Sequence, residues 1–298
     1  MFGDIFARLS NFRIQPWVHP SSIMDSELTV PLDVLGHITE LLAAPGDDRD
    51  SIKSLQNLSQ TCKFMVPICR RHLFSSLCLR STSISERFSD LLLENPDIAR
   101  YVRSLNYRMY NPIRDHEFTI LNILKVRSPL KSIDLSSQGL VWNSFPESIR
   151  SSLVSLIQLP TVTHLNINFF TRFPATVLSG CTNLINLQFG YIELTLPDSE
   201  FNHVISRSKI PTPTSLNIER GTHGFEALLD YASSHEGGSI DFSRVQIAKF
   251  QVDCQGDIVN INKLIKVTRR LQYIDIMSEW LALFKVLSHQ NFDSKILL

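Results

Sequence analysis

The apolar residues between positions 30 and 42 follow helical spacing. This stretch reads VPLDVLGHITELL, and Pro31 suits a first helical turn because its missing N–H has no partner to lose there. Five apolar residues recur on one stripe: Val34, Leu35, Ile38, Leu41 and Leu42. Residues 43–46 (AAPG) end the pattern. It predicts a short amphipathic helix whose stripe must be buried against something inside or outside the chain.

Two more helical patterns follow within the next 35 residues. Ile52, Leu55, Leu58 and Cys62 are spaced by three, three and four, and a third apolar pattern runs from about residue 67 to residue 77. Residues 30–79 therefore read as three short helices. A unit of this size buries little surface on its own, so we expect it to lean on a neighbour or a partner.

The same segments resemble an F-box. The resemblance rests on residues 30–35 (VPLDVL), 55–64 (LQNLSQTCKF) and 67–74 (PICRRHLF), together with Ile38 and the Leu41–Leu42 pair. It implies that residues 26–80 dock on the Skp adaptor of a cullin–RING ubiquitin ligase. The candidate contacts are apolar residues, some of which must also form the segment's own core: Pro31, Leu32, Val34, Leu35, Ile38, Leu55 and Leu58.

From about residue 81 onward a repeat with the pattern apolar-x-x-apolar-x-apolar is present. Its seven copies are Val102-Leu105-Tyr107, Leu130-Ile133-Leu135, Val162-Leu165-Ile167, Leu184-Leu187-Phe189, Pro213-Leu216-Ile218, Ile247-Phe250-Val252 and Leu271-Ile274-Ile276. The last three positions of each copy alternate as in a strand with one buried face. Helical patterns at 117–126, 148–159, 225–233 and 258–268 lie between them.

One strand and one helix per unit is typical of a leucine-rich repeat, in which stacked units bury a continuous core. The array is similar to the irregular repeats that accompany F-boxes in many fungal proteins. We therefore expect an α/β fold: a flexible extension (1–25), an F-box (26–80) and a leucine-rich-repeat-like solenoid (81–298) with a parallel sheet on its concave face. A last helix is expected at 280–289, followed by an apolar end at 296–298.

The strand positions that point away from the repeat core are nearly all polar. In a horseshoe-shaped array these positions line the concave sheet, which is the usual partner-binding surface. The residues predicted to bind a target are Arg108, Asp134, His164, Asn166, Gln188, Asn217, Lys249, Gln251 and Tyr273. Any solvated sheet face would also be polar, so the pattern alone does not separate binding from solvation.

The charge balance indicates which classes of partner are not expected, and the cysteine content indicates the compartment. The 298 residues carry 29 Lys and Arg against 29 Asp and Glu, giving a net charge of zero and a pI of about 7.1. Nucleic acid and anionic membranes select basic surfaces, so neither is the expected partner. Five cysteines without a recognisable pairing pattern indicate reduced thiols in a cytoplasmic or nuclear protein.

No catalytic or metal-binding motif emerges. Cys69 and His72 have a plausible zinc spacing, but no second pair follows at a suitable distance. We expect neither an enzyme nor a bound cofactor or metal. The first functional hypothesis is a substrate-recognition subunit of an SCF-type cullin–RING ligase, and the alternative is a protein-binding scaffold of leucine-rich repeats without a role in ubiquitylation.

Overall fold

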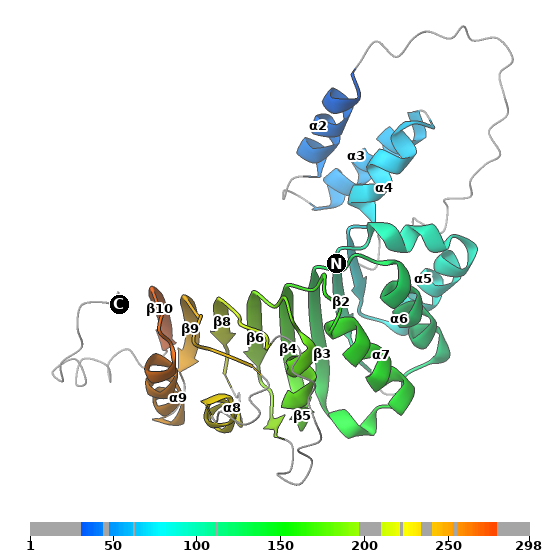
Figure 1. Ribbon diagram of the computed structural model, residues 1–298. Helices are drawn as coiled ribbons and strands as arrows, with labels where there is room; N and C mark the ends of the chain where they lie inside the picture. The colour runs from blue at the N-terminus through cyan, green and yellow to red at the C-terminus, as the bar shows by residue number, and fades with distance from the viewer. Residues whose placement is uncertain are drawn as a thin grey trace, which may run out of the picture.

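A computed structural model describes residues 31–43, 48–61, 63–110, 112–196, 210–220, 223–233, 240–252 and 255–278. The extension expected at 1–25, the helix expected at 280–289 and the segment 296–298 lie outside these residues. The described chain is mixed α/β (Figure 1). It begins with three helices and continues with strands that alternate with helices or 3-10 turns.

The first three helices match the sequence prediction. They are α2 (Leu32–Leu42), α3 (Asp48–Thr61) and α4 (Met65–Leu73). Their shared core is small, with Leu55, Met65 and Cys69 each at most 3% exposed. The third helix was expected to reach residue 77 but ends at Leu73, because the chain then enters a strand.

Eight parallel strands form the main sheet in chain order, β1-β2-β3-β4-β6-β8-β9-β10. All seven predicted strands are present, and β1 was not expected. Their bounds are β1 (Ser76–Leu79), β2 (Ser104–Arg108), β3 (Ser132–Val141), β4 (His164–Thr171), β6 (Asn186–Gly190), β8 (Ser215–Ile218), β9 (Ile247–Val252) and β10 (Tyr273–Ser278). A separate short pair joins β5 (Phe173–Pro174) to β7 (Leu194–Thr195).

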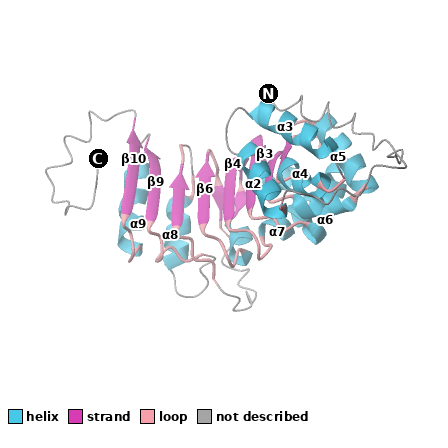
Figure 2. Cartoon of the chain, turned by 90° about the horizontal axis from the view of Figure 1, so that it is seen from above, coloured by secondary structure: helices cyan, strands magenta, loops and turns pink. Residues whose placement is uncertain are grey.

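Helices and 3-10 turns cover one face of the sheet (Figures 1 and 2). These elements are α5 (Thr82–Glu94), η1 (Pro96–Tyr101), α6 (Asp115–Arg127), η2 (Trp142–Ser144), α7 (Glu147–Ile157), η3 (Ala175–Gly180), α8 (Phe225–Ser233) and α9 (Gln255–Val267). The four predicted helices correspond to α6, α7, α8 and α9, whereas α5 was not predicted. We call the opposite side of the sheet the open face.

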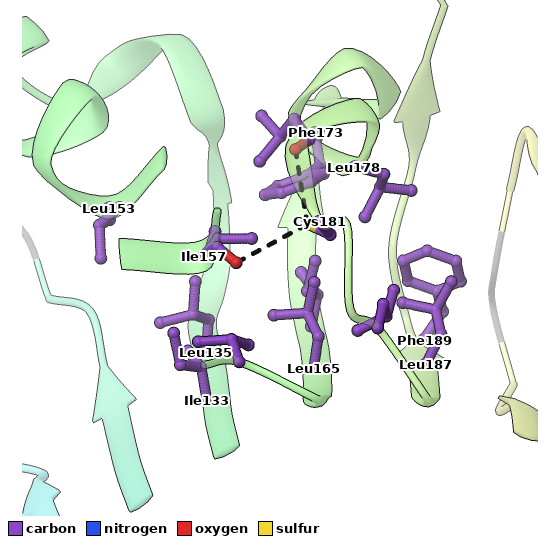
Figure 3. Close-up of a cluster of buried hydrophobic side chains, with 14 of the residues drawn as sticks. Ile133, Leu135, Leu153, Ile157, Leu165, Phe173, Leu178, Cys181, Leu187 and Phe189 are labelled. Carbon is purple, nitrogen blue, oxygen red and sulfur yellow. Dashed lines mark hydrogen bonds between the residues drawn. The ribbon is translucent and has the colours of Figure 1, made fainter. Parts of the chain in front are cut away.

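The main core lies between the sheet and these helices. Paired inward residues form a continuous column across seven strands, each at most 3% exposed: Leu105, Ile133, Leu165, Leu187, Leu216, Ala248 and Ile274. Figure 3 shows part of this core, including Cys181, whose thiol lies 3.7 Å from the carbonyl oxygens of Ile157 and Val177. Each unit thus buries its apolar residues against the next one along the chain.

The register corrects one predicted repeat. Phe250 was expected to align with Leu216 and Ile274, but Ala248 occupies that place and Phe250 pairs with Ile218. The matching pattern in this unit is therefore Val245-Ala248-Phe250, and all three residues are fully buried or nearly so. Since the shift is two residues, the side of the sheet to which each side chain points is unchanged.

The helical segment joins the sheet directly. Leu73, the last residue of α4, packs against both the small core and the main core, and Phe74 already belongs to the main core. The carbonyl of Ser75 accepts hydrogen bonds from the backbone N–H groups of Arg103 (2.8 Å) and Ser104 (2.9 Å). The sheet therefore begins within residues 26–80, the range expected for the F-box.

Candidate functional site

The first candidate surface is an exposed apolar stripe on α2. Val34, Ile38 and Leu41 are 45%, 40% and 63% exposed, and their spacing of four and three places them on one side of the helix. The adjacent side of the helix carries the half-buried Leu35 and Leu42, which pack on the small core. A helix this short gains most of its stability from packing. An apolar stripe left exposed on such a helix is typical of an interaction surface.

The structure separates the seven predicted adaptor contacts into two groups. Pro31, Leu32, Val34 and Ile38 are exposed. Leu55 is 3% exposed and is a core residue, while Leu35 and Leu58 pack against that core. Leu41 is an exposed member of the stripe that the candidate set omits. Its spacing of three from Ile38 was the signal that could have included it.

Polar groups border this apolar stripe. His37 and Glu40 lie on the exposed side of α2, with 4.0 Å between the Nδ1 of the imidazole and the carboxylate. On α4, burial together with the positive charge of Arg71 lowers the pKa of His72, and the charge of Glu40 partly opposes that shift. An apolar centre with a charged border is the usual layout of a protein-binding patch.

The second candidate surface is the open face of the sheet. All nine predicted target-binding residues lie on it, in three rows that run across the strands. The first row holds His164 and Tyr273, and the second holds Asp134, Asn166, Gln188, Asn217 and Lys249. The third row begins with Arg108 and includes Gln251, which pairs with Met277 on β10.

Side-chain hydrogen bonds connect the second row around Asp134. Its carboxylate accepts from the amides of Asn106 (2.7 Å) and Asn166 (3.2 Å), and Asn168 donates to the Asn166 carbonyl oxygen at 2.9 Å. Burial raises the pKa of Asp134, while the charge of Arg80 partly lowers it. These bonds hold the polar groups in fixed positions, so this part of the surface is pre-ordered.

A second polar contact lies where β6 faces β8. The amide of Gln188 donates to the carboxylate of Glu219 at 2.5 Å. Gly190 makes room for this arrangement, because a Cβ there would stand 2.5 Å from Asn168 Oδ1 and 2.7 Å from Glu219 Oε2. The centre of the open face therefore carries two carboxylates, from Asp134 and Glu219, held by amide donors.

Four of the predicted target-binding residues on the open face are exposed. Arg108, His164, Lys249 and Tyr273 are exposed, and the Arg108 guanidinium lies 5.7 Å from the ring centre of Tyr110. Positive charge at Arg108 and Lys249 thus flanks the acidic centre. Mixed charge of this kind gives a surface directional preference for its partner.

Across the described ranges, no three His, Cys, Asp or Glu side chains are grouped so that they could hold a metal ion. None of the helices in this part of the chain has both the length and the apolar character that crossing a membrane requires.

No protein-family model matches the chain, and no curated protein is significantly similar to it in sequence. The chain is a mixed α/β protein with a parallel sheet, an exposed apolar stripe on α2 and a pre-ordered polar face.

Proposed function

We propose that the chain is a substrate-recognition subunit of an SCF-type cullin–RING ubiquitin ligase. In this proposal α2–α4 form an F-box that docks on a Skp-family adaptor, and the open face binds the target. The chain itself carries out no bond chemistry. It raises the local concentration of target lysines beside the ligase.

The observation that carries the docking assignment is the stripe of Val34, Ile38 and Leu41. It is apolar and exposed, although among the described residues of this segment the buried hydrophobic core holds only Leu55, Met65 and Cys69. Burying each such side chain in a partner's groove contributes roughly 1.5–3 kcal/mol before the costs of association. Lying in a hydrophobic groove is a common use of an amphipathic helix, and it would complete the burial that the chain leaves unfinished.

The repeat array supports the second half of the proposal. We propose that β1–β10 and their helices form an irregular leucine-rich-repeat solenoid. Supporting this are the strand order, which follows the chain without exception in the main sheet, and the column of inward residues described above. A solenoid of this kind presents one strand per unit to its partner, so the rows of the open face form an extended binding surface.

Binding to a purified Skp-family adaptor tests the docking assignment. Ile38→Asp places a charge in the middle of the stripe without entering the small core, so it should abolish co-purification with the adaptor and leave thermal unfolding unchanged. Leu93→Asp is the matched control, because Leu93 is 65% exposed on α5, away from the stripe. Adaptor binding that survives Ile38→Asp, or that is absent from the unaltered chain, would contradict the proposal.

The role in ubiquitylation needs a separate measurement. Proteins captured by the unaltered chain and lost by an open-face variant such as Asp134→Lys are candidate targets. A target whose half-life lengthens when Ile38→Asp replaces the unaltered chain supports the ligase role. Targets that bind equally and whose half-lives do not change favour the alternative, a scaffold without a role in ubiquitylation.

A further inference from the structure

Two exposed aromatic rings are stacked at the edge of the open face, where β4 and β6 end. Phe169 and Tyr191 are 44% and 45% exposed, their ring centres are 4.9 Å apart and their planes differ by 7°. Large aromatic side chains at the centre of a contact contribute more to protein binding than most residue types. A pair fixed in parallel is therefore a strong candidate for an anchor point.

The backbone turns both rings outward through an unusual conformation. Phe169 has φ 60° and Tyr191 has φ 50°, which is the left-handed region that bulky residues rarely adopt. Phe169 lies at a register shift between β3 and β4. Ser136 pairs with Asn168 and Leu140 pairs with Phe170, so three residues of β3 lie opposite the single residue Phe169 of β4. Alternation along β4 is broken there, and Phe169 leaves the core side.

Neighbouring groups hold this conformation in place. The buried hydroxyl of Ser137 donates a hydrogen bond to the carbonyl of Phe169, and the N–H of Tyr191 donates to the carbonyl of Arg220 at 2.7 Å. Directly after Phe169, Phe170 is 1% exposed and packs edge to face with Trp142 and with the other rings of its cluster. The exposed pair thus stands on a rigid, fully packed base.

A hollow of about 410 Å³ adjoins the pair. It is lined by Phe170, Thr171, Tyr191, Ile192, Glu193 and His223. The backbone of Glu193 is tied down on both sides, since its N–H donates to the carbonyl of Phe170 (2.9 Å) and its carbonyl accepts from Phe173 (2.8 Å). The lining of the hollow therefore includes the aromatic Tyr191 and the acidic Glu193, whose backbone is fixed.

We propose that this corner of the sheet, formed by Phe169, Tyr191 and Glu193, binds an arginine side chain on an extended segment of the target; that the occupant is the target rests on the proposed function. A guanidinium group matches both features of the hollow. Its flat face stacks on an aromatic ring, and its fork of N–H donors pairs with a carboxylate through two parallel hydrogen bonds. A lysine ammonium offers the charge without the planar stacking surface, and an acidic side chain would face Glu193.

Selection from a phage-displayed random dodecapeptide library on the purified full chain tests this inference. Arginine should be enriched at one position of the selected peptides. A synthetic copy of the best peptide should bind at least about tenfold more weakly when that arginine is replaced by citrulline, which keeps the shape and loses the charge. Tyr191→Asn and Glu193→Gln should each lower the affinity of the chain for the arginine peptide to a similar degree. Glu86→Gln, an exposed carboxyl on α5, is the matched control and should change nothing.

Several results would overturn it. Selection without arginine enrichment is one, and an arginine peptide that binds Tyr191→Asn as well as the unaltered chain is another. Enrichment of acidic peptides that depend on the exposed Arg172, tested by Arg172→Ala, would assign the corner to the opposite charge. Asparagine tolerates the left-handed region, so thermal unfolding of Tyr191→Asn should show an intact fold.

This inference and the proposed function fail separately. If the chain selects arginine peptides but does not bind a Skp-family adaptor, the arginine-binding corner is supported and the ligase assignment is contradicted. If the chain binds the adaptor through Ile38 but shows no preference for arginine peptides, the docking assignment is supported and the arginine-binding corner is contradicted.

Discussion

The phenolic hydroxyl of Tyr107 donates a 2.8 Å hydrogen bond to the carboxyl group of Glu117, and neither side chain is more than 2% exposed. This contact ties β2 to the first turn of α6 within the main core. Burial raises the pKa of Glu117 above its usual 4.5, although the hydrogen bond from Tyr107 works in the opposite direction. Burial also raises the pKa of Tyr107, with the Glu117 charge adding to the shift.

These shifts predict how stability depends on pH. The folded chain holds the Glu117 proton more tightly than the unfolded chain, so this group favours folding at low pH and its contribution is lost as the pH rises from 4.5 to the folded pKa. Glu117→Gln removes the titration and keeps an oxygen that accepts from Tyr107. Urea unfolding between about pH 4 and pH 8 should give a flatter stability profile for the variant than for the unaltered chain.

Tyr107→Phe is the companion variant. It leaves the buried Glu117 without its donor and should cost about 1–3 kcal/mol in unfolding free energy near neutral pH. The cost should shrink at low pH, where the carboxyl is protonated in both states. A cost that does not vary with pH would contradict the assignment.

Gly36→Ala should stabilise α2. An added Cβ at this helical position meets no atom within 4 Å, and alanine is favoured over glycine inside a helix by roughly 0.5–1 kcal/mol. Slower hydrogen exchange of the α2 amides would show the effect. Because residue 36 faces away from Val34 and Ile38, adaptor binding should be unchanged or slightly stronger, and a loss of binding would show that this side of α2 also makes contact.

Phe169→Asn should raise the stability of the fold while removing half of the stacked pair. Left-handed backbone at a bulky residue costs on the order of 1–3 kcal/mol, whereas an aromatic contact contributes about 0.5–1.5 kcal/mol. The balance favours asparagine, which adopts this conformation readily. The midpoints of the two ranges differ by about 1 kcal/mol, so chemical denaturation should show an increase of about that size. A clear decrease would mean that the ring supports the fold itself.

Thiol labelling should report the two cores separately. Burial raises the pKa of the Cys181 thiol to about 12, so it should react with iodoacetamide only when the main core opens. Cys69 is fully buried in the smaller core and should react at lower denaturant concentration. Mass spectrometry that assigns the label by residue separates these sites from the other cysteines. Equal labelling of Cys69 and Cys181 across the urea series would show that the cores unfold together.

The sequence was most informative where the core repeats. A spaced pattern of apolar residues located seven strands, because each unit must place two or three side chains in the same inward column. It misassigned the register at β9, since Ile247-Phe250-Val252 fits the pattern as well as Val245-Ala248-Phe250 does, and the small side chain of Ala248 is a weak signal. It missed β1, whose four residues begin three positions after the last residue of α4 and include Leu77, which also fits the preceding helical spacing.

The candidate surfaces were predicted only in part. Alternation placed the open-face residues correctly, and it did so even at β9 because a two-residue shift keeps each side chain on the same face. Alternation could not find Phe169, which follows Asn168 and precedes Phe170 in β4. Which of two adjacent phenylalanines points outward depends on the extra residues of β3 and on the Ser137 hydrogen bond, and these are tertiary features.

The direct junction at Leu73 and Ser75 has a consequence for the proposed assembly. Only Phe74 and Ser75 separate helix α4 from β1, and the Leu73 side chain packs against both cores. In the proposed assembly, this packed junction fixes the distance and the angle between the adaptor bound to α2 and a target bound on the open face. Which of its lysines come within reach of the ligase is then decided by geometry, and a well-bound target with lysines on the wrong side would escape modification.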